Sequence, residues 1–241
     1  MRFIVMHKVD ATMEAGGPPS QDLIEKMGAL VQGSRQSGVF LNGAGLHRSA
    51  RRARLTCAGG DCSVTRGPYG GQNELVSSLT MISAKSLDAA IEHARQLASS
   101  LGDVEIEVGP VVEPWDLGLM PKPPTAPERF LLLCKASADD EAGDNAAKHA
   151  AAVKQLAASF AGDGAVVAAE TLAPSRRGAR LSGSASGQRV WVDGPFAESK
   201  ELIAGFSLLQ LPSKKEALAW ADRYAAILGD NEVDVREVNE P

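Results

Sequence analysis

The order of apolar and polar positions predicts strands and helices that alternate along the chain. Residues 3–9 are an apolar run rich in β-forming side chains, which is typical of a buried strand. Between Ser20 and Gly38, apolar residues recur every three or four positions, so an amphipathic helix is predicted there. In the first half we predict strands at residues 3–9, 39–46, 52–57, 62–66, 75–83 and 104–112, helices at 20–38 and 86–101, and a Gly- and Pro-rich loop at 11–19.

The second half of the chain repeats this order with a nearly constant offset. The sequence RFIVMHK at residues 2–8 recurs as RFLLLCK at 129–135, and Gly67-Pro68 recurs as Gly194-Pro195, in both cases 127 positions later. A repeat of this length indicates a duplicated domain and not a solenoid. We predict strands near 129–135, 164–172, 178–183, 188–193, 202–210 and 231–238, and helices near 145–161 and 213–228.

These elements predict the domain organisation and the fold class. We expect one repeat at residues 1–112, a proline-rich linker at 113–127 that packs on a domain surface, and a second repeat at 128–241. Each repeat runs strand, helix, strands, helix, strand with an inserted hairpin, which is a ferredoxin-like α+β plan. Its helices cover one face of an antiparallel sheet and leave the other face open. We therefore expect the two sheets to pack together as a pseudo-two-fold internal dimer, in a barrel or a sandwich.

Composition and charge narrow the function classes. The net charge is −5 and the pI is near 5.5, which argues against nucleic acid and anionic membranes as partners. No apolar run approaches the roughly 20 residues that span a bilayer, so we expect a cytoplasmic protein. Cys57 and Cys62 could face each other across a hairpin, but reduced thiols are expected in that compartment. The sequence shows no phosphate loop, dinucleotide fingerprint, metal-ligand spacing or Ser/His/Asp set, so we predict no cofactor or metal.

A polar motif in the second repeat carries a family resemblance. Residues 193–201, with the sequence DGPFAESKE, and the IAGF at 203–206 resemble the signature of YCII-related proteins with the DGPF motif. The resemblance covers nearly all of both repeats. It implies the dimeric α+β barrel superfamily, which includes small-molecule isomerases and monooxygenases. Some members are encoded beside extracytoplasmic-function sigma factors.

The resemblance also implies a His–Asp pair in a pocket, because related YCII proteins are thought to carry one. His7 of the first repeat is replaced by Cys134 in the repeat that keeps the motif, so the sequence does not locate that pair. His93 and His149 lie in predicted helices, where we expect them to be exposed. His47 follows a strand end near several arginines, where it could titrate at the mouth of a pocket.

The motif itself offers candidate chemistry. Asp193 and Glu198 are candidate acid/base groups if burial raises a carboxyl pKa, and Lys200 could hold an anionic substrate. The alternative is structural, with Asp193 capping the turn and Lys200 in solvent or in an ion pair. The first repeat keeps the Gly-Pro pair but has Arg66 in place of Asp193. The turn therefore belongs to the fold, and the lost charges concern something that one half needs.

Other charged residues recur in both repeats. Lys8 and Lys135 each end a first strand, and Glu14 and Glu141 follow them in the next loop. We expect such lysines to be solvated or to close the loop in an ion pair, with a pocket-lining role as the alternative. Clustered arginines could bind an anion or a partner's acidic surface, or protect a sheet edge. They are Arg48, Arg51, Arg52 and Arg54 in the first repeat, and Arg176, Arg177 and Arg180 in the second.

Together these features predict a protein that binds a small polar or anionic metabolite in a pocket of the second repeat. If it is an enzyme, we expect cofactor-independent acid/base chemistry of the isomerase or lyase kind, with Asp193 or Glu198 moving the proton. The rival hypothesis is a non-catalytic regulatory protein that acts with a sigma factor. We expect a monomer with an internal pseudo-dimer, or a homodimer. The predicted substrate-binding residues are Lys200, Arg180, Lys135, Glu141 and Ser175.

Overall fold

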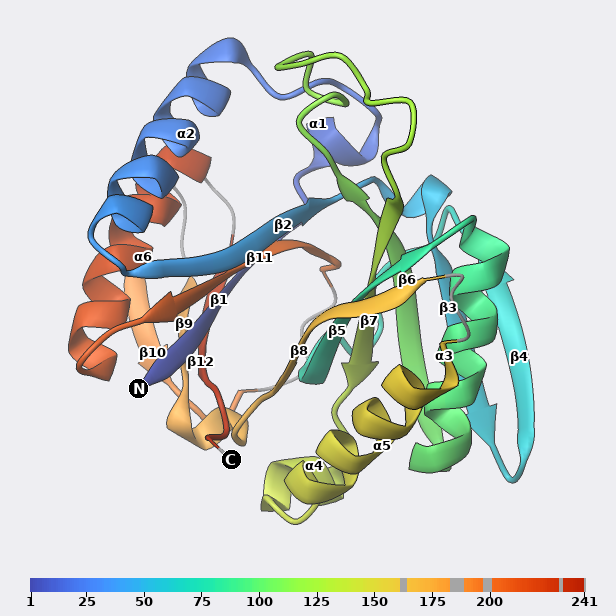
Figure 1. Ribbon diagram of the computed structural model, residues 1–241. Helices are drawn as coiled ribbons and strands as arrows, with labels where there is room; N and C mark the ends of the chain where they lie inside the picture. The colour runs from blue at the N-terminus through green and yellow to red at the C-terminus, as the bar shows by residue number, and fades with distance from the viewer. Residues whose placement is uncertain (161–163, 183–188, 197–200, 230–231, 241) are drawn as a thin grey trace.

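The computed structural model describes residues 1–160, 164–182, 189–196, 201–229 and 232–240 (Figure 1). Its strands form close to the residue ranges where strands were predicted, in both halves of the chain. They are β1 (Arg2–Lys8), β2 (Phe40–Leu46), β3 (Ala53–Ala58), β4 (Asp61–Arg66), β5 (Val76–Ala84), β6 (Val104–Val112), β7 (Glu128–Lys135), β8 (Ala165–Thr171), β9 (Ala179–Ser182), β10 (Val190–Asp193), β11 (Ile203–Gln210) and β12 (Val233–Glu237).

The helices include four long ones at the predicted places and two short ones that were not predicted. Residues 11–19 were expected to be a loop, but Asp10 accepts a hydrogen bond from the Met13 N–H and starts a short helix. Ser137 and Asp140 form a reciprocal capping box that starts another. The helices are α1 (Ala11–Glu14), α2 (Gln21–Gln36), α3 (Leu87–Leu101), α4 (Ala138–Ala142), α5 (Ala146–Ser159) and α6 (Lys214–Leu228), with 3-10 turns η1 (Ser49–Arg51) and η2 (Ser175–Arg177).

The strands make two four-stranded sheets that join into a barrel. We call β12-β1-β11-β2 the terminal sheet and β6-β7-β5-β8 the central sheet. They meet where β2 pairs with β6, and a bridge between Leu172 and Val238 joins β8 to the end of β12 on the opposite side (Figure 1). The hairpin β3–β4 extends the central sheet from β6, and β9–β10 extends the terminal sheet from β12. The expected ferredoxin-like, pseudo-two-fold α+β architecture is therefore confirmed.

The first strands of the two repeats are exchanged, which the sequence did not predict. β1 lies between β11 and β12 of the second repeat, and β7 lies between β5 and β6 of the first. The second strands are exchanged as well, because β2 pairs with β11 and β8 pairs with β5, so each sheet takes two of its four strands from each repeat. The two first strands share an Arg-Phe start, an apolar middle and a final Lys, so the sequence does not distinguish their neighbours.

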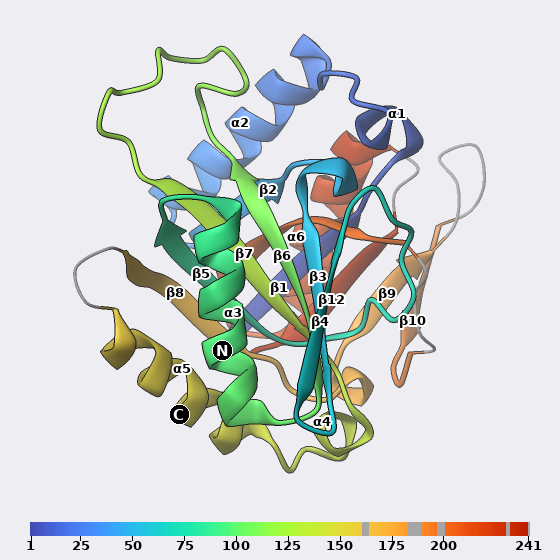
Figure 2. The same ribbon diagram turned by 90° about the vertical axis from the view of Figure 1, so that its right-hand side faces the viewer.

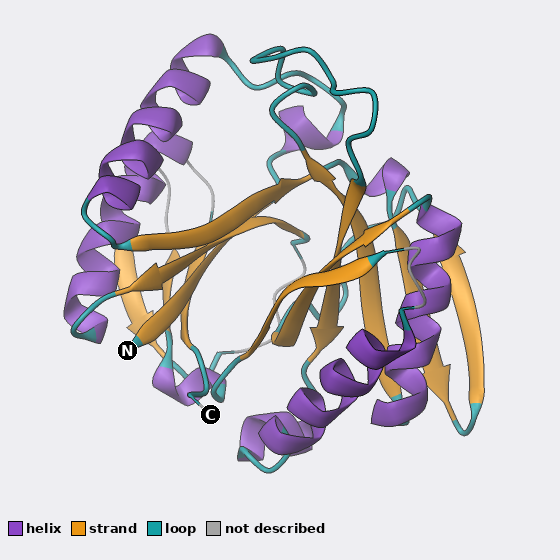
Figure 3. Cartoon of the chain, in the orientation of Figure 1, coloured by secondary structure: helices purple, strands orange, loops and turns teal. Residues whose placement is uncertain are grey.

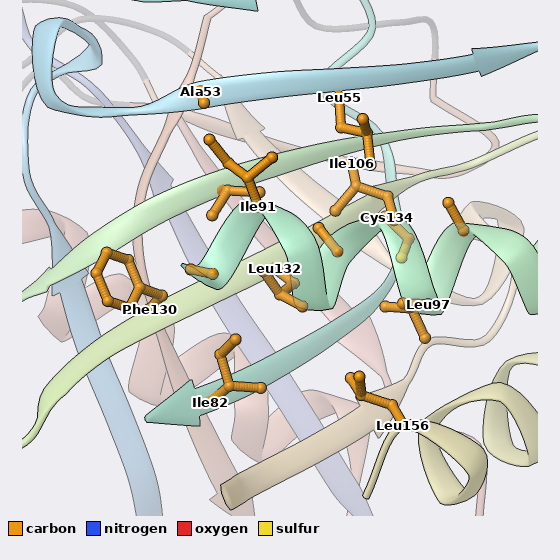
Figure 4. Packing of buried hydrophobic residues seen from close by; sticks show 14 of the residues in the cluster. Ala53, Leu55, Ile82, Ile91, Leu97, Ile106, Phe130, Leu132, Cys134 and Leu156 are labelled. Atoms are coloured by element: carbon orange, nitrogen blue, oxygen red, sulfur yellow. The ribbon is translucent and has the colours of Figure 1, made fainter. Parts of the chain in front are cut away.

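The inner strands β1, β5, β7 and β11 are buried on both faces, which explains their unbroken apolar runs. On β1, Ile4 and Met6 face the barrel interior, while Phe3 and Val5 face the layer of α2 and α6. The interior is filled by side chains from both sheets. Figure 3 shows the helices outside the strands. Figure 2 shows α3 and α5 on the outer face of the central sheet, and Figure 4 shows the apolar cluster beneath them.

Two further expectations have definite outcomes. A disulfide joins Cys57 to Cys62 across the β3–β4 hairpin, so the expectation of reduced thiols there was wrong. Cys134 is a free, buried thiol. The linker contacts both neighbouring segments, because Glu113 pairs with Arg129 and Asp116 lies 3.2 Å from His47 Nε2. No helix among the described residues is long and apolar enough to cross a membrane.

Candidate functional site

The Gly-Pro turn of each repeat has a structural role, as its retention in both copies predicted. A Cβ on Gly194 would overlap the Ser175 carbonyl oxygen, so only glycine fits this close approach. The Phe196 N–H then donates to Ser175 Oγ at 3.2 Å. Gly67 meets the Ser49 carbonyl in the same way in the first repeat. The Gly-Pro turn therefore packs closely against the segment that contains Ser175 or Ser49, which is a structural role.

Ser175 and Glu141, both predicted to bind substrate, are brought together by the structure. The Glu141 carboxylate accepts the Ser175 N–H at 2.9 Å and also accepts the Ser175 hydroxyl. Glu14 and Ser49 make the same contacts in the first repeat. These contacts tie each 3-10 turn to the short helix before it. The predicted ion pairs from Lys8 and Lys135 to these glutamates are not the ones that form, because each lysine has other partners.

Lys135 instead belongs to a buried group that we call the central charge cluster: Arg52, Arg54, Glu74, Glu107 and Lys135. Glu107 is completely buried and lies 2.7 Å from Arg52 Nη1 and 3.4 Å from Lys135 Nζ. Burial works to raise the pKa of Glu107, but Lys135 and Arg52 lower it overall. Lys135 also pairs with Glu74. The expectation of a solvated lysine was therefore wrong.

Arg180 lies in the matching group of the other sheet, the terminal charge cluster: Lys8, Arg180, Asp234 and Arg236. Asp234 accepts from Arg180 Nε at 2.6 Å and lies 3.3 Å from Lys8 Nζ, with Lys8 completely buried. Burial works to raise the pKa of Asp234, but Lys8 and Arg180 lower it overall. The Arg180 guanidinium stacks 4.7 Å from the Phe196 ring. Lys135 and Arg180 therefore lie in different sheets and do not share one site.

The motif carboxylate Asp193 lies on the surface. Its side chain is 80% exposed and pairs with Lys214 Nζ at 2.7 Å. In the first repeat, Arg66 pairs with Asp88 in the first turn of α3, one position beyond the counterpart of Lys214, so a similar link has its charges reversed. This reversal favours a structural role for Asp193, and its predicted acid/base role stays a prediction. Glu198 and Lys200 lie outside the described residues.

The structure brings together a polar group that the sequence analysis missed. His149, in the first turn of α5, has Nε2 at 2.9 Å from Asp140 Oδ1 on α4. Its Nδ1 lies 2.9 Å from Ser78 Oγ on β5. The expectation of an exposed His149 was wrong, since its side chain is 7% exposed. A Ser/His/Asp set therefore exists in space although none was evident in the sequence. The capping box of Ser137 and Asp140 was the available signal.

The electrostatics of this group favour proton transfer over nucleophilic attack. Burial works to raise the pKa of Asp140, but hydrogen bonds from His149 and Ser137 lower it to about 2. Asp140 is therefore ionised at neutral pH and can stabilise a protonated imidazole. Ser78 is almost completely buried, and burial raises the pKa of its neighbour Cys134 to about 12. Neither the hydroxyl nor the thiol is placed to attack a bound substrate.

Asp140 and His149 line a polar cavity of about 490 Å³, which we call the acid–base cleft. Its wall comes from both repeats, because Thr56 and Asn73 lie opposite the start of α5. Charged side chains of both signs line it, among them Glu105, Lys135, Asp139 and Lys148. Within the described residues, no three His, Cys, Asp or Glu side chains gather as metal ligands would. The cleft suits a small molecule with several polar groups.

A family model described as the YCII-related domain matches residues 1–106 and 129–240. The chain belongs to the YCII-related family. The two matched segments confirm a tandem YCII-related protein, as the repeated motif and strands predicted. Comparison with curated proteins and with solved structures gives no match. Within this YCII-related chain, His149 and Asp140 are a His–Asp pair that lines a cavity, which is the kind of pair that the family resemblance implied.

Proposed function

We propose that this YCII-related protein binds a small polar or anionic metabolite in the acid–base cleft and moves a proton on it. The observation that carries the proposal is the 2.9 Å contact between His149 Nε2 and Asp140 Oδ1 at the wall of a cavity of about 490 Å³. A histidine oriented by an ionised carboxylate is a common general acid/base. The proposed chemistry is of the isomerase or lyase kind.

The contacts of the imidazole suggest how it would work. If the Ser78 hydroxyl donates to Nδ1, then Nε2 carries the proton and donates it to Asp140. Ser78 is buried behind the ring, so a metabolite reaches the imidazole from the Asp140 side. When Nδ1 is also protonated and donates to Ser78 Oγ, the ring holds two protons, and Nε2 would give its own proton to the metabolite and take it back later. Asp140 would stabilise the imidazolium whenever the ring holds both protons.

The surrounding charges support a polar ligand. Lys148 is exposed at the cleft and its ammonium is available to a carboxylate or phosphate of the metabolite. Asp139 and Glu105 would accept hydrogen bonds from hydroxyl or amino groups. Lys135 is paired with Glu74 and Glu107. It therefore shapes the wall of the cleft and contributes to its electrostatic field, but it does not offer an unpaired charge to the ligand.

The test is a thermal-shift screen of the full chain against small organic acids, amino-acid derivatives and sugar phosphates. A ligand that binds the native state raises the melting temperature by mass action. We expect a hit whose shift is lost in His149→Gln and in Asp140→Asn. The matched control is His93→Gln, which changes a histidine on α3 that contacts Phe160 away from the cleft. Each shift is measured against the melting temperature of the same variant without ligand.

Hits would then be followed by NMR of the imidazole resonances during titration. The proposal expects the His149 signal to move with ligand and the His93 signal to stay in place. Retention of every ligand shift in both cleft variants would contradict the proposal. So would a screen in which no small polar molecule raises the melting temperature.

A further inference from the structure

A second cavity, of about 360 Å³, lies where the first repeat meets the linker. Its floor and walls come from the loop at residues 16–19, from η1 and from the linker itself. We call it the arginine pocket, because cationic side chains dominate its polar lining. They are Arg48, Arg51 and Arg52. His47 also lines the pocket, and Asp116 is the one carboxylate among its described lining residues.

Two of these arginines have charge that the described residues leave uncompensated by a carboxylate. Arg48 makes one weak contact, 3.4 Å from the Ala15 carbonyl. Arg51 Nη1 lies 3.0 Å from the ring of His47. Burial and the neighbouring Arg51 lower the pKa of His47, so this ring is neutral at pH 7 and does not balance Arg51. The Asp116 carboxylate is held by His47 and by the Glu113 N–H.

The third arginine gives the pocket a rigid base. Arg52 is completely buried, with Nη1 donating at 2.7 Å both to Glu107 and to the Ile203 carbonyl. Its Nη2 has no hydrogen-bond partner among the described residues, and it is buried from solvent. Arg52 is therefore a fixed base for the pocket, with its charge paired to Glu107 and one nitrogen left without a partner among the described residues. A polar nitrogen left in this state is costly unless a ligand or an ordered water meets it.

The loop is shaped to hold Arg48 at the pocket. Gly16 has φ +90°, and a Cβ there would overlap Arg48 Nη1. Two requirements therefore favour glycine at this position. The backbone has a positive φ, and the Arg48 guanidinium occupies the space that a Cβ would need. The arrangement presents a planar donor group beside a cavity, which is the geometry that oxyanions accept.

The pseudo-equivalent place in the other half lacks these features. It is a cavity of about 10 Å³. Ala173 and Pro174 stand there in place of His47 and Arg48, and Arg177, the counterpart of Arg51, is paired with Glu237. The matching positions are Gly16 with Gly143, Leu46 with Leu172 and Ala204 with Ser77. The first half has thus gained both space and unpaired positive charge.

From these contacts we propose that the arginine pocket binds a small oxyanion, the carboxylate or phosphate group of a metabolite. Arg48 and Arg51 would donate to its oxygen atoms from the rim, and Arg52 would form the rigid base of the site. The site is separate from the acid–base cleft and does not depend on the function proposed there.

The test is isothermal titration of the full chain with two probes, inorganic phosphate and succinate, in a buffer free of other oxyanions. Arg48 and Arg51 are both exposed, so the double variant Arg48→Ala with Arg51→Ala is expected to fold. Loss of two charge-assisted donors should weaken binding at least about tenfold. Tighter binding of one probe identifies phosphate or carboxylate as the preferred group.

The matched control is Arg176→Ala with Arg177→Ala, which removes the same charge from η2 in the other half. Both double variants lower the net charge by the same amount, so the control measures the general attraction of anions to the protein. We expect this control to change the affinity less than about twofold. Equal weakening in both double variants would overturn the proposal, as would no heat of binding for either probe at millimolar concentration. His149→Gln should leave this binding unchanged, which separates a failure here from a failure of the acid–base proposal.

Discussion

Glu107 in the central sheet and Asp234 in the terminal sheet occupy the same strand position, 127 residues apart, and each is the acid at the centre of a buried charge cluster. Both carboxylates lie opposite an arginine on the next strand, Arg54 or Arg180. Both also contact the lysine that ends an exchanged first strand. The central cluster also contains a second acid, Glu74. The clusters differ further in the strand that supplies the second arginine.

That difference is compensated. Arg52, the residue just before β3, packs against Gly109. A Cβ added to Gly109 would lie 3.4 Å from Arg52 Cδ. In the terminal sheet the glycine is Gly178 and the arginine is Arg236, so the two residue types have changed places across the strand pair. Each cluster keeps one arginine and one glycine there. The salt bridges of Arg66 with Asp88 and of Asp193 with Lys214 also have opposite polarity, although Asp88 lies one position beyond the counterpart of Lys214.

The two pockets where the repeats meet show the opposite behaviour. Neither His149 with Asp140 nor Arg48 with Arg51 has a compensating partner at the matching place in the other half. Compensated differences therefore mark the framework that both halves need. Uncompensated differences mark places where one half has acquired a task of its own, and this is why we place the candidate chemistry in the pockets and not in the charge clusters.

The largest expected effect comes from the acids at the cluster centres. Glu107→Gln and Asp234→Asn each leave buried cations without their main partner, which should cost about 3–5 kcal/mol of unfolding free energy. Similar losses in urea denaturation would show that the clusters are equivalent. Asp22→Asn is the control, because its pair with Lys26 is exposed and worth less than about 0.5 kcal/mol. A loss below about 1 kcal/mol in one sheet alone would break the comparison.

The next effect concerns His7, which stands where the other half has Cys134. Burial lowers the pKa of His7 from 6.5 to about 4. Between these values the unfolded chain binds a proton that the folded chain does not, so stability falls as the pH falls from 6.5 to 4. The shift corresponds to about 3 kcal/mol. Urea denaturation at several pH values should show a flatter slope for His7→Gln, and an unchanged slope would contradict the assignment.

A smaller effect tests the exchange of arginine and glycine. Arg52→Gly and Gly109→Arg should each destabilise the central sheet, one by removing a partner of Glu107 and the other by crowding Arg52. Combined, they recreate the terminal arrangement. We expect the double variant to lose about 1–3 kcal/mol less unfolding free energy than the sum of the two single losses. Additive losses in a double-mutant cycle would show that the two positions do not compensate.

The smallest effect belongs to the surface salt bridge of the motif. Asp193→Lys places two lysines together at the start of α6, and adding Lys214→Asp restores the pair with reversed charge. Solvent screens this exposed pair, so the single change should cost no more than about 1 kcal/mol. Recovery in the double variant is the expected result of chemical denaturation. If recovery fails, Asp193 has a role beyond this salt bridge.

Much of the fold could be predicted because local signals decided it. Ser20, Ser86 and Ser213 cap long helices where side-chain spacing had placed them. The apolar runs of β1 and β7 are long and uninterrupted because both faces of those strands are covered. The exchange of these two strands could not be predicted, since both segments have the same apolar pattern and no local signal assigns either one to its neighbours.

The candidate site was harder to predict for reasons of distance and length. Helix α4 has five residues, too few for a periodic pattern, so the sequence predicted no helix at Asp140 and an exposed His149. Lys135 meets Glu74 from 61 positions away, and a buried lysine at a strand end looks the same in sequence as a solvated one. Tertiary contacts, which a single sequence does not reveal, determine both outcomes.

The exchanged strands also bear on the order in which the protein is made. All four strands of the central sheet lie in the stretch of chain from β5 to β8. This stretch leaves the ribosome before β11 and β12 are synthesised. That sheet can therefore form while β1 waits for its neighbours. The two ends of the chain finally meet, with the Arg2 N–H 3.2 Å from the Glu240 carboxylate. Joining them and opening the chain in the linker would give a circular permutant in which the terminal sheet is synthesised without interruption.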